Sequence, residues 1–360
     1  MTVRIVPVPI VSWPNPATDW MYEGIARVGS ASSMALYGHD DLVSTGQETF
    51  LYLFHVRSFE HIVAVAVEGE DRAENVIGFA QSMILVNSNP TMAELWVTVH
   101  PDHRSRGVGT QLADWVETQV AARGRTSLIT YPDTTEPVGD EPVLTAAEGD
   151  TVPANTPGVL FALARGYTLR QVARRSRLDL PVSKDLLAEL YAQTIGHHDA
   201  YRFHQWLGAP PDPWLEKLVG LNTAMSTDTP MGELSIGEDP YDVERLQAIY
   251  ELHEARDWAC LTTAAEHIAT GEIAGFTDLI VPRDTRTAGE QWNTIVARDH
   301  RGHRLGLAIK VMNLRRLADL HPQISRLYTW NASENAHMLA INTALGFYPS
   351  GGCATLQKGD

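Results

Sequence analysis

The sequence predicts two tandem α/β domains, each a mixed, mostly antiparallel sheet flanked by helices. Two observations carry this prediction. The chain has 360 residues, about twice the size of a common domain, and a segment that begins at Val99 recurs 197 positions later at Val296. An offset close to half the chain indicates duplication of a whole domain. We therefore expect one domain over residues 1–182 and a second over residues 183–360, with the boundary beside Pro181.

The repeated segment follows an apolar strand and leads into a helix in both copies. In the first copy we expect the strand over residues 95–99 and the end of the helix at Gly124. In the second copy the strand covers residues 292–296 and the helix ends before Pro322. Further strands are expected over residues 61–67, 76–85, 172–178, 259–267 and 275–281, the last two joined by a turn at Gly271. Residues 196–229 are expected to form the early helical part of the second domain.

The first copy carries an insertion. Asn155 to Tyr167 corresponds to Asn335 to Phe347 at an offset of 180, so the first copy has 17 additional residues between the loop and its last helix. They lie within residues 132–158, which are rich in Asp, Glu and Pro and contain no Lys or Arg. Two interpretations stay open, a solvated surface loop or a lid that shapes a site for a cationic acceptor.

The composition is that of a folded, soluble protein. Hydrophobic residues make up 44% and charged residues 20%, which excludes fibrous and disordered classes. The formal net charge of -16 disfavours nucleic acid and anionic membranes as partners. Two cysteines are too few for a disulfide framework, and neither a leader segment nor a membrane-spanning run is evident. We therefore expect a cytoplasmic protein with no nucleic-acid or membrane partner, and the sequence leaves open whether it forms an oligomer.

A strand, a basic glycine-containing loop and a helix together predict an anion site. The first N–H groups of a helix and its dipole attract negative charge, and Gly107 and Gly109 allow a diphosphate to approach the backbone closely. The arginines of each loop can add charge-assisted hydrogen bonds. Neither the ending of a mononucleotide P-loop nor the third glycine of a dinucleotide fingerprint is present.

The first loop, Arg104-Ser105-Arg106-Gly107-Val108-Gly109, resembles the diphosphate loop of the GCN5-related N-acetyltransferase (GNAT) superfamily, which reads Arg/Gln-x-x-Gly-x-Gly/Ala. The second loop has Arg304 where the first glycine belongs, and a shift to His303–Ala308 restores both small residues but loses the initial Arg. The late helix of the second copy is also similar to the family. The whole chain resembles a tandem GNAT group common in actinobacteria, to which mycothiol synthase is related by architecture.

The resemblance implies an acyl-CoA co-substrate, with acetyl-CoA favoured and no metal. Its diphosphate would lie on the loop and its pantetheine along the preceding strand, which a bulge separates from its neighbour. The implied CoA-binding residues are Val99, Arg104, Arg106, Gly107, Val108, Gly109, Thr110 and Asn155 in the first copy, and Val296, Arg301, His303, Arg304, Leu305, Gly306, Leu307, Asn331 and Asn335 in the second. Helix capping is the alternative role for Asn155 and Asn335.

For catalysis, the resemblance implies a carboxylate that takes the proton of the attacking amine and an acid for the leaving thiolate. Glu94 and Glu290, ten and eleven residues upstream of Arg104 and Arg301, are the candidate bases, and each also fits a solvated strand end. Many family members carry a tyrosine acid four residues before the glycine that ends the last helix. That position holds Ala162 in the first copy and Asn342 in the second, so Asn342 is included as a catalytic candidate; Tyr167, Tyr328 or a water are the alternative acids.

These features together predict an acyl-CoA-dependent N-acyltransferase that transfers acetyl to a primary amine of a small molecule by direct attack on the thioester. The acidic composition favours a positively charged acceptor. A non-catalytic or single-site acyl-CoA-binding protein and a protein or peptide N-acetyltransferase stay open as alternatives. The second copy is slightly favoured for catalysis, and CoA is expected in either.

Overall fold

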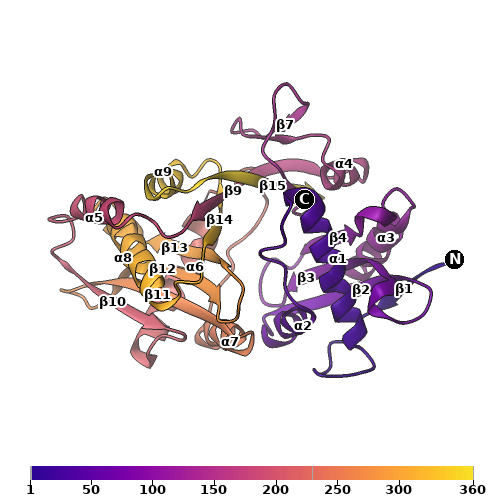
Figure 1. The fold of residues 1–360 in the computed structure, drawn as a ribbon, viewed down its shortest axis with the longest axis horizontal. Coiled ribbons are helices and arrows are strands. Elements are labelled where there is room, and N and C mark those ends of the chain that lie inside the picture. Colours follow the sequence, from indigo (N-terminus) through magenta and orange to yellow (C-terminus); the bar gives the residue numbers. More distant parts are fainter. Residues whose placement is uncertain (1, 229, 360) are drawn as a thin grey trace. The chain divides into compact units, whose positions relative to one another are not determined.

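The computed structural model describes residues 2–228 and 230–359 (Figure 1). The chain divides into two compact units: unit 1 comprises Met1–Val172, Met231–Gly237 and Gly352–Asp360, and unit 2 comprises Ala173–Pro230 and Glu238–Gly351. Each unit contains a mostly antiparallel sheet and flanking helices. This confirms the predicted fold class.

Unit 1 is built on four antiparallel neighbours, β1 (Val3–Pro7), β2 (Phe59–Glu68), β3 (Val76–Leu85) and β4 (Met92–Val99). The next strand, β5 (Ser127–Thr130), pairs parallel with the first half of β4 and antiparallel with the end of β15 (Tyr348–Lys358). Its helices are α1 (Asp19–Tyr37), α2 (Gly46–His55), α3 (Val108–Ala121) and α4 (Pro157–Ala164), with short 3-10 turns η1 (Ala73–Asn75) and η2 (Pro101–His103).

Unit 2 repeats this plan. Its antiparallel neighbours are β10 (Tyr201–Leu207), β11 (Trp258–His267), β12 (Ile273–Pro282) and β13 (Ala288–Val296). Strand β14 (Arg326–Ala332) pairs parallel with the start of β13 and antiparallel with the end of β9 (Thr168–Asp179). The helices are α5 (Lys184–Ala192), α6 (Asp212–Asp228), α7 (Val243–Ala255), α8 (Leu305–Leu320) and α9 (Ala336–Leu345), and η3 (Arg298–His300) precedes α8.

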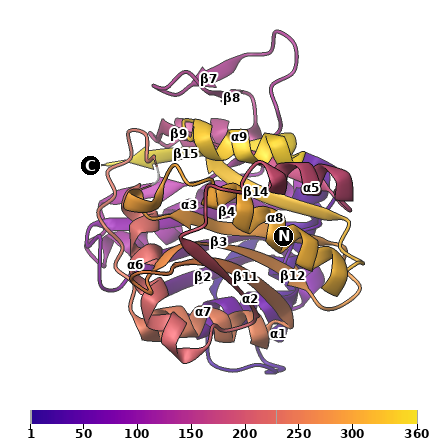
Figure 2. The ribbon, with the colours of Figure 1, turned by 90° about the vertical axis from the view of Figure 1, so that its left-hand side faces the viewer.

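The helix that follows each repeated loop packs on the sheet of its own unit. In α3, Leu112, Val116 and Val120 are spaced by four residues, so they share one face, and all three are buried in the core of unit 1. In α8, Leu314 and Leu317 are buried in the core of unit 2, and the helix lies across β11 and β12 (Figure 2). Apolar burial of these faces holds each helix against the sheet of its unit.

Two strands, β9 and β15, are each divided between the two units. Strand β9 passes from unit 1 to unit 2 after Val172, and β15 returns to unit 1 at Gly352, where its end supplies the antiparallel partner of β5. The compact units therefore differ from the halves 1–182 and 183–360. The division falls inside β9 because the second half of this strand pairs with β14 rather than with a strand of unit 1.

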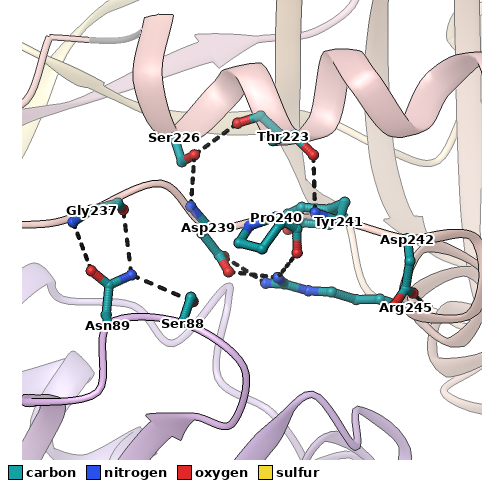
Figure 3. Close-up of polar contacts among 10 residues, drawn as sticks. All are labelled: Ser88, Asn89, Thr223, Ser226, Gly237, Asp239, Pro240, Tyr241, Asp242 and Arg245. Carbon is teal, nitrogen blue, oxygen red and sulfur yellow. Dashed lines mark hydrogen bonds and ion pairs between the residues drawn. The ribbon is translucent and has the colours of Figure 1, made fainter.

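Residues 231–237 also belong to unit 1, although α6 and α7 on either side of them lie in unit 2. The Gly237 N–H donates to Asn89 Oδ1 at 2.6 Å, and Asn89 Nδ2 donates to the Gly237 carbonyl at 3.3 Å (Figure 3). Two residues later, both carboxylate oxygens of Asp239 accept from Arg245 at 2.7 Å, at the start of α7. A side-chain amide and an ion pair thus fix the path of this segment.

The expected strands at 61–67, 76–85, 259–267 and 275–281 lie in β2, β3, β11 and β12. The prediction that residues 196–229 are helical is wrong in its first part, because Tyr201–Leu207 forms strand β10 and pairs with β11 along its length. An aromatic-rich run fits a half-buried pleated surface better than a helix. In the part of the chain that the structure describes, no helix is long and apolar enough to span a membrane.

The insertion of the first copy contains secondary structure of its own. Strands β7 (Val143–Thr145) and β8 (Thr151–Pro153) form a separate hairpin, and the short β6 (Asp133–Thr134) pairs with β15. A lid role for this insertion stays a prediction.

Candidate functional site

The loop of unit 1 connects β4 to α3 through two left-handed residues, Ser105 (φ 59°) and Gly107 (φ 78°). Arg104 ties the loop to the end of its strand, since Nε donates to the Val99 carbonyl at 3.2 Å, and Nη2 donates to Ser32 Oγ at 2.9 Å. No described side chain caps the start of α3. The first amides of this helix are therefore left for a ligand.

The loop of unit 2 has the same backbone geometry, but its glycine is at the first of the two left-handed positions instead of the second. Arg301 Nε donates to the Val296 carbonyl at 3.1 Å, and the two left-handed residues are Gly302 (φ 86°) and Arg304 (φ 52°). Arg304 directly precedes α8, as Gly107 directly precedes α3. The loops therefore correspond without the register shift that the sequence suggested, and Arg304 adopts the conformation that glycine provides in unit 1.

Both loops present backbone amides to an anion. The predicted contacts Val108, Gly109 and Thr110 form the first turn of α3, and Leu305, Gly306 and Leu307 form that of α8. Val108 and Leu305 are each 1% exposed as whole residues, so their side chains belong to the core and could not contact a ligand. Each loop can hold a phosphate group at a positive helix end.

The loop arginines have acidic partners. Arg106 Nη2 lies 2.6 Å from Glu68 Oε1, and this hydrogen bond lowers the pKa of Glu68. Arg301 Nη2 lies 2.7 Å from Asp228 Oδ2, and Arg298 pairs with the same carboxylate. Another predicted contact, His303, lies with Nδ1 at 3.1 Å from the His197 carbonyl oxygen. The guanidinium groups of Arg106 and Arg301 are thus already partly neutralised, which leaves the backbone amides as the main groups that could bind an anion.

A bulge interrupts β13 at Trp292 and Asn293. Thr277 of β12 pairs with Thr294, but Leu279 pairs with Gln291, so β13 has one extra residue between these positions. Side chains stabilise the break: Gln291 Nε2 donates to the Asp278 carbonyl at 2.8 Å, and Thr277 Oγ1 donates to the Asn293 carbonyl at 3.2 Å. The bulge lies where β13 has already separated from β14, because their parallel pairing ends at Glu290 and Tyr328.

Unit 1 has no such bulge between Glu94 and Val99, because the pairing of β3 with β4 keeps one register from Met83–Glu94 to Gly78–Val99. The expected bulge is thus confirmed in unit 2, and for unit 1 the expectation is wrong. The difference also explains the spacing of the two glutamates. Glu94 pairs with Met83 and Glu290 with Ile280, at corresponding positions, and the extra residue before Arg301 is the bulge.

The two glutamates have different neighbours. Burial raises the pKa of Glu290 above its usual value, and Arg256 opposes the shift. Glu94 is hydrogen bonded to Tyr131, which, together with burial, raises the pKa of that phenol. A carboxylate with a raised pKa suits a general base near neutral pH, whereas Glu94 is engaged as an acceptor.

Two aromatic side chains stack just beyond the last paired residues of β4 and β5 in unit 1. Trp96 of β4 stacks on Tyr131, which follows β5, with ring centroids 5.6 Å apart. Nearby, Leu234 and Ile236 of the 231–237 segment pack with Tyr131 against the cluster of Leu85, Met92 and Ile129.

The strands of unit 2 differ at this point. Trp292 packs edge-on against His253 of α7, and Trp330, which corresponds to Tyr131, is 36% exposed. The structure gives no stack between Trp292 and Trp330 that would match the closed pair of unit 1. The same strand positions thus carry a closed aromatic pair in unit 1 and separate tryptophans in unit 2.

The late helices hold the remaining candidates. Asn335 caps α9, since its side chain accepts from the Met338 N–H at 3.2 Å, whereas Asn155 precedes Thr156, the N-cap residue of α4. Asn342 is buried and donates to Asn331 Oδ1 at 2.8 Å.

The alternative acids are both buried. Tyr167 lies 3.3 Å from Glu117 Oε1, which with burial raises its pKa, and Tyr328 is 0% exposed beneath Arg175.

Sequence reasoning missed Lys310 and the aromatic closure of unit 1. Lys310 is 1% exposed and donates to Asn342 Oδ1 at 2.7 Å. Its position on the apolar face of α8, beside Ile309 and Leu314, was the available signal. Among the described residues, no group of three or more His, Cys, Asp or Glu side chains could hold a metal ion.

Comparisons with known proteins agree with this geometry. Residues 34–137 match the model of the acetyltransferase (GNAT) family. A tandem GNAT protein from the clavulanic acid biosynthesis pathway, without AcCoA, is 20% identical with a TM-score of 0.76 over 99% of this chain and 98% of that one. A GCN5-related N-acetyltransferase from Sphaerobacter thermophilus is 14% identical, with a TM-score of 0.59 over 99% and 95% of the two chains. At these identities the likeness shows the fold, and no curated protein matches the sequence.

Proposed function

We propose that this chain, which has the fold of tandem GNAT proteins, is an acyl-CoA-dependent N-acyltransferase that acts in unit 2. One observation carries the proposal: unit 2 combines the anion-binding loop with a bulge in β13 and a partly desolvated Glu290 on the same strand. Unit 1 has the loop but a regular strand and a stacked aromatic pair in its place.

In unit 2, acyl-CoA would extend from the start of α8 along the unpaired part of β13. The amides of Leu305, Gly306 and Leu307 would donate to the diphosphate, and the dipole of α8 would favour its charge. Beyond Glu290, β13 no longer pairs with β14, so its edge groups are available to the amides of pantetheine. The thioester would then lie beside the bulge at Trp292 and Asn293.

The bulge and Glu290 would supply the chemistry. A backbone N–H at the bulge would donate to the thioester oxygen as negative charge develops there. Glu290, directly or through one water, would take a proton from the amine nitrogen as its lone pair attacks the carbonyl carbon. The C–N bond forms, the C–S bond breaks, and the electron pair leaves on sulfur. Positioning of both reactants contributes much of the rate.

We propose acetyl as the acyl group and a primary amine of a small molecule as the acceptor. The net charge of -16 favours a cationic amine by long-range attraction. Unit 1 is proposed to bind CoA through its loop without turnover, because Trp96 and Tyr131 fill the gap between its strands. A panel of neutral amines, cationic amines and short peptides tests the acceptor: equal rates for neutral and cationic amines would remove the charge argument, and a preference for peptides would favour a protein N-acetyltransferase.

The loops can be tested one at a time with Gly109→Asp and Gly306→Asp. Both glycines lie in the first turn of a helix, and an added Cβ would make ordinary contacts with Phe161 at 3.6 Å and with Ile341 at 3.4 Å respectively. The carboxylate would repel the diphosphate. Calorimetric titration with acetyl-CoA should show two sites in the parent protein and one in each variant.

Turnover then assigns the productive unit. We expect Gly109→Asp to keep acyl transfer and Gly306→Asp to lose it. The reverse pattern would place catalysis in unit 1, and the absence of acetyl-CoA binding to the parent protein would overturn the proposed function.

A further inference from the structure

A buried chain of three polar side chains runs through unit 2 from α8 to the end of β14. Lys310 Nζ donates to Asn342 Oδ1 at 2.7 Å, and Asn342 Nδ2 donates to Asn331 Oδ1 at 2.8 Å. Lys310 and Asn342 are each 1% exposed, whereas Asn331 is only partly buried. Asn331 lies three residues beyond Tyr328, where the parallel pairing of β14 with β13 ends. The chain of hydrogen bonds thus reaches the part of β14 that has separated from β13.

The fold does not require these side chains, because unit 1 has none of them. The offset of the two loop helices places Ala113 where α8 has Lys310, and the late helix has Ala162 where α9 has Asn342. The register of the parallel strands places Pro132 at the position of Asn331. Both alanines are buried, at 3% and 4% exposure. Unit 1 therefore fills the same place with apolar groups.

Burial of Lys310 has an energetic cost. Burial alone lowers the pKa of its ammonium to about 7, and no acidic side chain compensates it. The contacts of Nζ are Asn342 of α9 and the ring of Phe347, whose centroid is 5.7 Å away, and neither is charged. A buried cation held by one neutral amide is costly, and such arrangements are typical of functional sites rather than of stable cores.

The hydrogen bond that Lys310 donates determines the orientation of both amides. Nζ has N–H donors in its charged and in its neutral form, and it donates to Asn342, so the oxygen of that amide faces it. The NH₂ group of Asn342 must then face Asn331, and it can bond only to the oxygen of that amide. The NH₂ group of Asn331 is consequently the end that remains to donate. Each bond also polarises the next one in the low-dielectric interior.

We propose that Lys310 is a positioning residue that orients Asn342 and Asn331 so that Asn331 Nδ2 donates to the sulfur leaving group of acyl-CoA in unit 2. This inference rests on the proposed function and adds to it the means of stabilising the leaving group. When the C–S bond breaks, its electron pair stays on sulfur as a thiolate, which accepts this hydrogen bond. The thiolate takes its proton from solvent on release, so no protein group needs to lose one.

The test measures the ionisation of the CoA thiol while it is bound. In Gly109→Asp protein, which retains only the unit 2 loop, ultraviolet thiolate absorbance is followed against pH with bound CoA. Cys260 and Cys353 do not interfere, because burial raises the pKa of each thiol well above its usual value. We expect bound CoA to ionise at a pKa about one unit below that of free CoA, which is tenfold tighter binding of the thiolate.

Lys310→Met and Asn342→Leu, each added to this protein, should return the thiol pKa to that of free CoA. The matched ligand is desulfo-CoA, which lacks the sulfur and should bind all three proteins equally, so it also reports correct folding. With acetyl-CoA, Lys310→Met should lower kcat about tenfold and leave KM unchanged.

Two outcomes would contradict the inference and differ from each other. If neither CoA nor desulfo-CoA binds Gly109→Asp protein, the proposed function of unit 2 fails and the inference fails with it. If CoA binds but its thiol is unshifted, or if the shift survives Lys310→Met while desulfo-CoA affinity is intact, the role of Lys310 alone is overturned.

Discussion

The two units share the geometry of the loop before α3 and α8 and differ in the strand that precedes this loop. Both loops have a left-handed pair of residues before a helix and an arginine bonded to the preceding strand. Beyond the loop, β13 has a bulge and β4 has none, and the three polar residues at Lys310, Asn342 and Asn331 correspond to two alanines and a proline. These differences are the basis of the proposed division into a catalytic unit 2 and a unit 1 that binds CoA without turnover.

The difference extends to the cores. Unit 2 buries Asp278, whose pKa burial raises to about 7 and whose Oδ1 accepts from Thr262 at 2.5 Å, and it also buries Lys310. The corresponding residues in unit 1 are the neutral Gln81 and Ala113. Burial of an ionisable group costs free energy unless partners compensate it or the group becomes neutral. Asp278 and Lys310 both lie in unit 2, which also has the bulge. The proposed division into a catalytic unit 2 and a binding unit 1 predicts this distribution.

The largest effect is expected for the two glutamates. Glu290→Gln removes the general base of unit 2 and should lower kcat/KM by roughly 10²–10⁴-fold, whereas Glu94→Gln at the corresponding position should leave it unchanged. The pH dependence of the rate tests the same role for Glu290. Glu290 acts as a carboxylate and burial raises its pKa, so the rate should rise with pH through that raised pKa and be lost below it.

The control for this pair is acetyl-CoA affinity, which neither variant should change because both glutamates lie away from the loops. Stopped assays across the pH range should show the acid limb in the parent protein and its loss in Glu290→Gln. An equal loss of rate in Glu94→Gln would mean that both units are productive.

The second comparison concerns the bulge itself. Deletion of Asn293 would leave Trp292 opposite Asp278, as Trp96 stands opposite Gln81, and would give β13 the regular register of β4. The amide that faces the thioester would then return to the strand ladder. We expect kcat to fall roughly 10²–10³-fold, the cost of one oxyanion donor, with acetyl-CoA affinity retained in calorimetry.

A matched change in unit 1 separates strand geometry from general damage. Insertion of one Asn after Trp96 gives β4 the residue count of β13 and should not alter turnover, because the catalytic strand is untouched. If deletion of Asn293 preserved kcat, the bulge would have no part in catalysis.

The sequence predicted the duplicated fold and both loops because these depend on local patterns. Apolar periodicity locates α3 and α8, and the loop motif recurs without a gap. The sequence already contained a sign of the bulge, because Glu94 lies ten residues before Arg104 and Glu290 lies eleven residues before Arg301. This difference in length does not show where the extra residue lies.

The polar chain could not be predicted in the same way. Lys310, Asn331 and Asn342 come from three elements that meet only in the folded unit, and a lysine on a helix is usually solvated. The strand assignment of Tyr201–Leu207 also depended on tertiary context, because its pairing with β11 outweighs the helical residues around it.

The smallest expected effect is a change in the stability of the two loops. Two reciprocal substitutions, which exchange the corresponding residues of the loops, test whether the loops share one geometry. Arg304→Gly gives unit 2 the residue of unit 1, and Gly107→Arg does the reverse. A left-handed conformation costs a non-glycine residue roughly 1–2 kcal/mol. Glycine avoids this strain, but it makes the unfolded chain more flexible, and that entropy offsets part of the gain in stability. Arg304→Gly should therefore raise the free energy of unfolding by about 0.5–1 kcal/mol, and Gly107→Arg should lower it by a similar amount.

The size of the second change is the sharper test. An added Cβ at Gly107 meets nothing within 4 Å, so the cost of Gly107→Arg comes from backbone strain and from a positive charge beside the start of α3, not from a steric clash of Cβ. Urea unfolding of both variants measures the pair, and Ser105→Gly in the unit 1 loop serves as a second relief of left-handed strain beside Arg304→Gly. A loss of several kcal/mol in Gly107→Arg would mean that the unit 1 loop cannot accept the residue that unit 2 uses. The two turns would then differ in their tolerance, and the diphosphate site could no longer be treated as one structure present twice.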